Sequence, residues 1–219
     1  MTLTLLDLYN SAATQEWAMY DNDATNGAEM EPSLILALNK SILEILSNYD
    51  FSFRARTHLI LTQPNIDTYD LPQGLIIKDS NGKYLVQYNG VTLDYAQDGA
   101  NLSENSGAPS KFYLKNNNIV FSPKPITRGM ATVEYYTLAI GEDINGEEIF
   151  ALKNPTDKLC VPNHLEELMR QAVISRAILN TIASESDENY SAYKKQANKS
   201  LKLLIKYSKG VGLDKKMKI

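Results

Sequence analysis

A change of hydrophobic period divides this sequence into three parts. In its middle part, short runs rich in β-branched and aromatic residues alternate with turn-forming clusters such as DSNGK, YNG and KNNN, a pattern typical of consecutive antiparallel strands. The runs are THLILT (57–62), LIIK (75–78), YLVQY (84–88), VTLDY (91–95), KFYLK (111–115), NIVFS (118–122) and ATVEYYTLA (131–139). On both sides of this region the apolar residues recur at helical spacing instead.

Helices are therefore expected at the two ends of the chain. The predicted helices cover residues 3–20, 33–48, 163–184 and 187–210. Thr4 with Asp7, and Asn163 with Glu166, have the spacing of N-terminal capping pairs. The polar segment 21–32 should connect the first helix to the second.

The expected fold class is α+β, with a helical bundle formed from the N- and C-terminal helices and a central antiparallel β-region. We expect residues 1–52 and 156–219 to form the helical part, which ends in a basic arm. Residues 53–155 should form the β-rich part. A chain of 219 residues is long enough to bury a substantial core.

The charges are unevenly distributed along the chain. From Lys194 to Ile219 there are nine lysines and one aspartate, which gives +8 and leaves −12 for residues 1–193. Five lysines of the fourth predicted helix advance by four, three, four and three residues, so they share about 80° of arc opposite the apolar stripe. They are Lys195, Lys199, Lys202, Lys206 and Lys209.

This lysine stripe has a structural interpretation, a solvated helix face, and a functional one, an electrostatic contact. The partner could be DNA phosphates or an acidic protein surface. We prefer the acidic protein, because residues 1–193 are strongly negative and no DNA-recognition motif is present.

The stretch GAPSKFYLKNNNIVFSPKP (107–125) predicts a tight β-hairpin. Asparagine tolerates the positive φ that such a turn requires, so the tip should comprise Lys115, Asn116, Asn117 and Asn118. Proline cannot donate a ladder hydrogen bond, so three prolines should end the strands sharply. These are Pro109, Pro123 and Pro125.

Residues that could support catalysis are sparse. His58 and His164 are not spaced with a second histidine or cysteine for metal binding, and Cys160 is expected to be a small core residue. No phosphate-binding or dinucleotide-binding glycine motif occurs. We therefore expect no enzyme activity, no cofactor and no metal. No apolar stretch approaches the ~20 residues that span a bilayer, so no membrane association is expected.

The order of these elements resembles the head-to-tail adaptor proteins of short-tailed bacteriophages, the tail tubular protein A-like group. The resemblance covers about residues 33–205. It rests on the aromatic cluster after the second helix, on YDLP (69–72), on VEYYTLA (133–139) and on two C-terminal helices. It also rests on the hairpin, whose pattern is G-x-P-x-x-[FY]-x-[apolar]-x-x-x-x-[IV]-x-[apolar]-x-P-x-P. The aromatic residues are Tyr49, Phe51 and Phe53. The acidic loop 21–31 departs from the pattern.

This resemblance implies a structural virion protein, made in the host cytoplasm, that forms a homododecameric ring. The ring would bind the portal protein on one side and the tail nozzle protein on the other, and genomic DNA would pass through its lumen without sequence-specific binding. The five lysines of the stripe would then contact the portal, and residues 115–118 would lie on the tail side. Two alternatives stay open: a virion-associated peptidoglycan hydrolase, and a nucleic-acid-binding module that uses the lysine-rich C-terminal helix.

Overall fold

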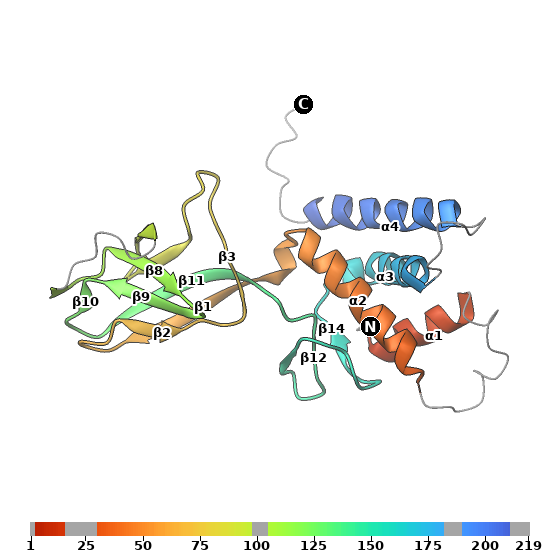
Figure 1. Cartoon of the computed structure of the whole chain (residues 1–219), viewed down its shortest axis with the longest axis horizontal. Coiled ribbons are helices and arrows are strands. Elements are labelled where there is room, and N and C mark those ends of the chain that lie inside the picture. The colour runs from red at the N-terminus through yellow and green to blue at the C-terminus, as the bar shows by residue number, and fades with distance from the viewer. Residues whose placement is uncertain (1–2, 16–29, 98–104, 182–189, 211–219) are drawn as a thin grey trace. The chain divides into compact units, whose positions relative to one another are not determined.

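The structure, a computed structural model, describes residues 3–15, 30–97, 105–181 and 190–210 (Figure 1). The chain forms two compact units. The helical unit comprises residues 1–53 and 139–219, and the β unit comprises residues 54–138. The predicted α+β class is confirmed.

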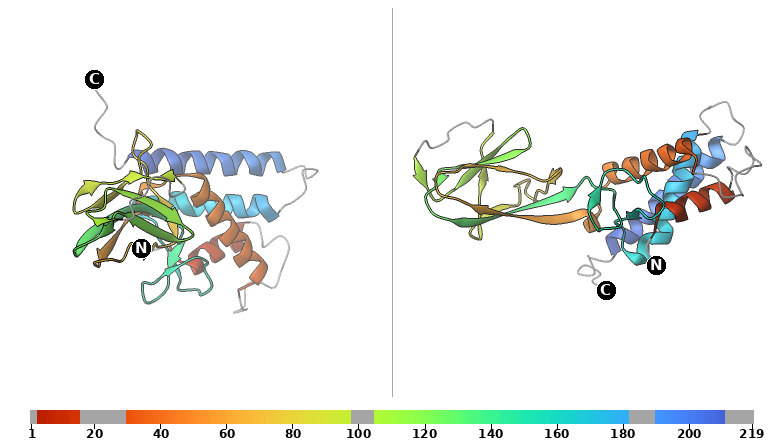
Figure 2. Two further views of the ribbon diagram at one scale, coloured as in Figure 1. Left: turned by 60° about the vertical axis from the view of Figure 1, so that its left-hand side comes forward. Right: turned by 90° about the horizontal axis from the view of Figure 1, so that it is seen from below.

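The helical unit places α3 in contact with all three other helices. Its helices are α1 (Leu5–Gln15), α2 (Pro32–Asn48), α3 (Glu166–Thr181) and α4 (Tyr190–Gly210). Figure 2 shows α4 lying alongside α3. Apolar side chains from both ends of the chain thus share one core, because Leu8, Leu38, Val173 and Leu204 all belong to the same buried cluster. Burying such side chains contributes roughly 1.5 to 3 kcal/mol each.

Of the two predicted N-terminal capping pairs, the one at α1 is formed and the one before α3 is not. At α1, the Thr4 backbone N–H donates to Asp7 Oδ2 (3.0 Å) and the Asp7 N–H donates to Thr4 Oγ1 (3.2 Å), so this capping pair is confirmed. The predicted pair at Asn163 and Glu166 is wrong. Asn163 begins a 3₁₀ turn, Asn163–Leu165, that directly precedes α3, and no side-chain cap is formed. Pro162 precedes this turn, and its carbonyl accepts a hydrogen bond from the Leu165 N–H at 2.8 Å.

Several predicted segments extend beyond what the structure describes. Residues 16–20 of the first predicted helix, the acidic loop up to residue 29, residues 182–189 and the tail 211–219 lie outside the described residues. The second helix agrees with its predicted span to within one residue.

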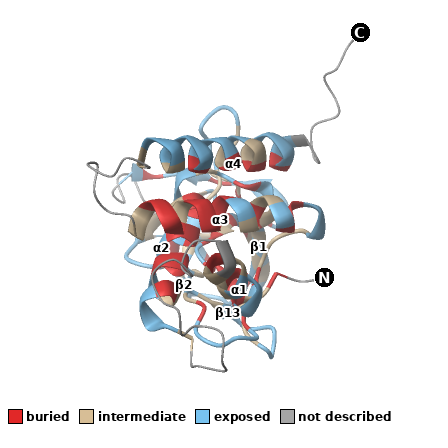
Figure 3. Ribbon diagram, turned by 90° about the vertical axis from the view of Figure 1, so that its right-hand side faces the viewer, coloured by how far each residue is buried: buried red, intermediate tan, exposed pale blue. Residues whose placement is uncertain are grey.

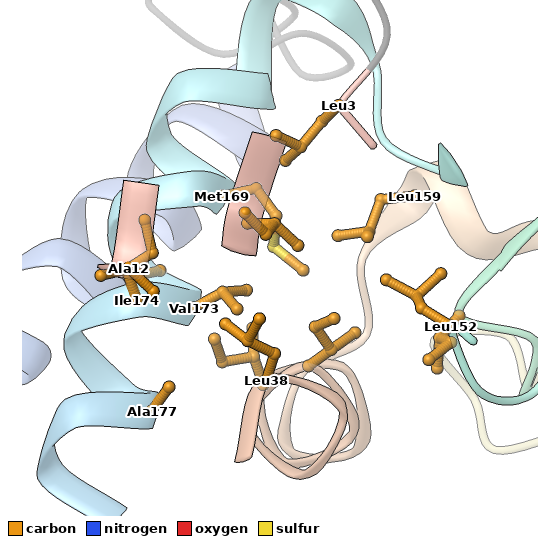
Figure 4. Close-up of a cluster of buried hydrophobic side chains, with 14 of the residues drawn as sticks. Leu3, Ala12, Leu38, Leu152, Leu159, Met169, Val173, Ile174 and Ala177 are labelled. Atoms are coloured by element: carbon orange, nitrogen blue, oxygen red, sulfur yellow. The ribbon is translucent and has the colours of Figure 1, made fainter. Parts of the chain in front are cut away.

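The boundary between the two units differs from the expected one at residues 155 and 156. Residues 139–155 belong to the helical unit, where a small sheet forms from β12 (Gly141–Glu142), β13 (Glu148–Ile149) and β14 (Lys158–Leu159). Ile140, Leu152 and Leu159 belong to the helical core. Figure 4 shows Leu152 and Leu159 among the core side chains of the helices. Burial of these apolar side chains explains why the segment packs with the helices.

The two larger sheets of the β unit share a second core. One sheet has the order β1 (Ala55–Thr62), β11 (Gly129–Thr137), β4 (Val86–Tyr88), β5 (Val91–Thr92), and β3 (Gly74–Ile76) also pairs with β11. The other has the order β2 (Thr68–Asp70), β9 (Asn118–Ser122), β8 (Lys111–Lys115), β6 (Asp94–Tyr95). Their shared core includes Val86, Phe112, Phe121 and Val133.

The expectation of an antiparallel region holds for the longer strands and fails at two short pairings. β6 runs parallel to β8, and β10 (Lys124–Pro125) runs parallel to β7 (Ser106–Gly107). The run VTLDY, predicted as one strand, is divided between the two sheets. The chain passes from one sheet to the other at Leu93, whose side chain is buried in the β core.

Candidate interaction surfaces

The first candidate surface is the lysine face of α4, defined by Lys195, Lys199, Lys202, Lys206 and Lys209. All five residues are exposed, whereas Ala197 and Leu204 on the opposite side of α4 are buried. Figure 3 shows this division, with the outer side of α4 exposed. The helical periodicity of the sequence therefore placed the lysines on the solvent side correctly.

The positive charge of this face is uncompensated on its own helix. α4 contains six lysines and no acidic residue. Among the residues that the structure describes, no ion pair involves these lysines. Lys206 Nζ lies 5.7 Å from the centroid of the Tyr207 ring, a cation–π contact that leaves its charge in place. The lysine face can therefore form charge pairs with an external partner.

The acidic charge of the chain lies in the helical unit. Residues 1–53 and 139–189 contain five basic and 18 acidic residues, net −13. Residues 54–138 contain eight basic and seven acidic residues, net +1, and residues 190–219 carry +8. The basic helix thus belongs to the same unit as the acidic residues, while the β unit is close to neutral.

The second candidate surface is the tip of the β8–β9 hairpin, Lys115 to Asn118. Asn116 has φ of 56°, as the turn prediction required. Lys115, Asn116 and Asn117 are exposed and Asn118 is half-buried. Asn117 Nδ2 donates to the Leu71 carbonyl at 2.7 Å, and the Leu71 N–H donates to the Asn117 carbonyl at 2.9 Å. The tip is thus held against the segment that follows β2.

The three prolines gather at the opposite end of this hairpin. β8 begins two residues after Pro109, and β9 ends directly before Pro123, as predicted. Pro125 differs from the prediction, because it lies inside the short strand β10 and pairs with Gly107. Its carbonyl accepts a hydrogen bond from the Asn65 N–H at 2.7 Å, which needs no proline N–H.

A pocket of about 350 Å³ adjoins the hairpin tip within the β unit. Its apolar lining includes Leu114, Val133 and Tyr135, and its polar lining includes Lys78 and Asn117. Lys78 Nζ lies 4.4 Å from the centroid of the Tyr84 ring, another lining residue. The sequence did not indicate this pocket, because its residues come from four separated segments and carry no common motif.

The residues considered for catalysis or metal binding are dispersed. His58 is half-buried in β1, His164 is exposed in the 3₁₀ turn, and Cys160 is half-buried, so its prediction as a core residue is wrong. In the described ranges, no group of three or more His, Cys, Asp or Glu residues could hold a metal ion. None of the described helices is both long and apolar enough to span a bilayer.

A second acidic loop, GEDINGEE (141–148), uses its single aspartate in its own turn. Asp143 Oδ1 accepts hydrogen bonds from the backbone N–H groups of Asn145 (2.8 Å) and Glu147 (2.9 Å). The bond from Glu147 is the main cause that lowers the pKa of Asp143 below its ordinary value. This carboxylate therefore stabilises a local turn.

Comparison with protein-family models and with curated proteins found no match for this chain.

Proposed function

We propose that this chain is a structural virion protein, the head-to-tail adaptor that links the portal to the tail nozzle. In this proposal twelve copies form a ring, and genomic DNA passes through its lumen without sequence-specific binding. The protein catalyses no reaction, and its contacts are with other proteins. The order of sequence elements supports this role.

The observation that carries the proposal is the uncompensated lysine face of α4. A face of regularly spaced, exposed lysines without acidic neighbours on its helix suits an acidic partner surface. We assign that surface to the portal protein. The net charge of −13 on the rest of the helical unit supports this choice over DNA, because it would repel a polyanion.

The hairpin tip supports a contact with the nozzle on the tail side. Its two hydrogen bonds to Leu71 restrict the tip before any partner binds, which lowers the entropic cost of docking. The adjoining pocket could accept an apolar side chain of the partner.

Charge reversal tests the portal contact. In one variant, Lys199, Lys202 and Lys206 are each replaced by Glu. A matched control reverses three exposed lysines elsewhere in the helical unit, Lys40, Lys153 and Lys158, so that the total charge change is the same. Binding to purified portal rings is measured by co-sedimentation, and folding by circular dichroism. We expect the first variant to stay folded and lose binding while the control binds; equal binding by both variants would contradict the proposal.

The lysine face also supports a second candidate, a nucleic-acid-binding module. That function predicts affinity for random duplex DNA that falls steeply with salt, because each neutralised phosphate releases counterions. Titration of labelled duplex at 50 and 200 mM salt distinguishes the two candidates. A steep salt slope that the three α4 reversals abolish would favour the DNA-binding function.

A further inference from the structure

The outer edge of β1 is a long strand edge without a partner in the described part of the chain. β1 is the terminal strand of its sheet and pairs with β11 without interruption from Ala55 to Thr62. Its other edge adjoins no strand formed by the described residues. Edges of this kind pair readily with strands of other chains.

The hydrogen bonds of β11 show which β1 groups point outward. The Glu134 N–H donates to the Leu85 carbonyl (3.0 Å), and its carbonyl accepts from the Ile77 N–H (2.8 Å), so both groups point away from β1. In an antiparallel pair the opposite residue, Thr57, must then direct its own N–H and C=O away from β11. The same alternation applies to Leu59 and Leu61.

Side chains on the exposed face of the same sheet make this edge apolar. Leu59 is 59% exposed, Leu61 is 76% exposed, and Met130, which lies opposite Leu61, is 47% exposed. β1 contains no proline, lysine or bulge, which are the usual features that prevent edge pairing. Backbone groups and apolar side chains thus favour the same event, the addition of a strand.

We propose that β1 pairs antiparallel with β1 of a second copy, across a two-fold axis at Leu59. In this register Leu59 lies opposite Leu59, and Thr57 lies opposite Leu61. Every outward N–H and C=O of these three residues then finds a partner. The one charged residue of β1, Arg56, lies opposite Thr62, so no like charges meet.

The lengths of the available edges favour a second β1 over any other strand of the chain. The other terminal or edge strands in the described β unit contain three residues or fewer; they are β2, β3, β5, β6, β7 and β10. None could match the eight residues of β1. A two-fold contact closes after two copies, so it does not build a ring, and the inference is independent of the proposed function.

Cysteine cross-linking of the full-length chain tests the register directly. In a Cys160→Ala background, Leu59→Cys should form a disulfide-linked dimer under mild oxidation, because directly opposite residues have Cα atoms about 5.5 Å apart. Thr57→Cys alone and Leu61→Cys alone should stay monomeric on a non-reducing gel. A mixture of these two variants should cross-link. Absence of the Leu59→Cys dimer, or self-linking of Leu61→Cys, would overturn the proposal.

Sedimentation of the protein alone provides a second measurement. The pair Leu59→Lys and Leu61→Lys should convert the dimer to monomer, because lysines at an edge prevent pairing. The matched control replaces two equally exposed leucines elsewhere, Leu36 (69%) and Leu75 (61%), with lysine and should stay dimeric. A monomeric unmodified protein at concentrations of tens of micromolar would refute the inference whether or not the chain binds a portal.

Discussion

The buried side chain of Asn39 in α2 forms two hydrogen bonds with the backbone of Leu152. Its Oδ1 accepts from the Leu152 N–H at 2.8 Å, and its Nδ2 donates to the Leu152 carbonyl at 2.9 Å. Asn39 also donates to the Ile35 carbonyl within α2. The side-chain amide of Asn39 therefore pairs both the N–H and the C=O of Leu152, whose side chain lies in the helical core.

Replacement of Asn39 by Leu should destabilise the protein by about 2 to 4 kcal/mol, because it leaves two buried backbone groups of Leu152 unpaired. Urea unfolding followed by circular dichroism measures this loss. Asn48→Ala is the control, since Asn48 is exposed and its side-chain amide donates to the Glu44 carbonyl of its own helix. A similar loss in both variants would contradict this role of Asn39.

The ion pair between Glu44 of α2 and Arg176 of α3 should make stability depend on pH. Hydrogen bonds from Arg176 lower the pKa of Glu44, and the pKa of Arg176 is raised by the same contact. The stabilisation is therefore complete above the ordinary glutamate pKa of about 4.3 and is lost as pH falls through the lower pKa of the folded state.

Accordingly, Glu44→Gln should lower the free energy of unfolding by about 1 kcal/mol at pH 7 and by much less at pH 3. Urea unfolding at the two pH values measures the difference. Glu167→Gln serves as the control, because Glu167 is exposed and its Oε2 lies 3.6 Å from Arg170 Nε, so it forms only a weak ion pair. A deficit for Glu44→Gln that is equal at both pH values would exclude the ionic contribution.

Gly141 occupies a position in β12 that leaves no room for a side chain. A Cβ there would lie 2.3 Å from the Lys158 carbonyl oxygen and 2.9 Å from Leu152 Cδ2. Gly141→Ala should therefore cost about 1 to 3 kcal/mol, because the β14 backbone must move.

The comparison for this substitution is Gly82→Ala. Gly82 has φ of 77° and open space around it, so the variant should lose only the roughly 1 kcal/mol that left-handed backbone costs. Thermal unfolding of both variants ranks them. A greater loss of stability for Gly82→Ala than for Gly141→Ala would contradict the prediction. It would show that the β12–β13–β14 sheet accommodates the added Cβ by a small shift.

The tether of the hairpin tip should matter for tail attachment, if the proposed function holds. Asn117→Ala removes the side-chain bond to the Leu71 carbonyl and should cost about 1 kcal/mol of tip stability while the fold persists. Binding to purified nozzle protein is expected to weaken. The control is Asn81→Ala in another exposed turn of the β unit. Unchanged nozzle binding by Asn117→Ala would show that the tip does not contribute to the interface.

Residues with a clear period were predicted well from the sequence. The apolar seam of α2 predicted the bounds of that helix to within one residue. The spacing of the α4 lysines predicted that they are exposed to solvent. These features are local, since they depend on residues three or four positions apart. The turn at Asn116 was likewise determined by local backbone preference.

Features that depend on distant residues could not be predicted in this way. Strands of two residues, such as β12 and β10, have no period to detect, so the sequence did not indicate that residues 139–155 join the helical core. The pocket beside the hairpin tip and the open edge of β1 arise from strand order, which the composition of each strand does not determine.

The pairing of β1 with β11 has a consequence for how such a protein can evolve. These strands are the first and last of the β unit, and Ala55 lies opposite Tyr136. Arg54 Nε donates to the Thr137 carbonyl at 3.0 Å. The first and last residues of the β unit, 54 and 138, therefore lie close together in space. Because the two junctions of the β unit are close in space, genetic recombination at both could replace the whole β unit with another domain. The helical unit would then keep its fold.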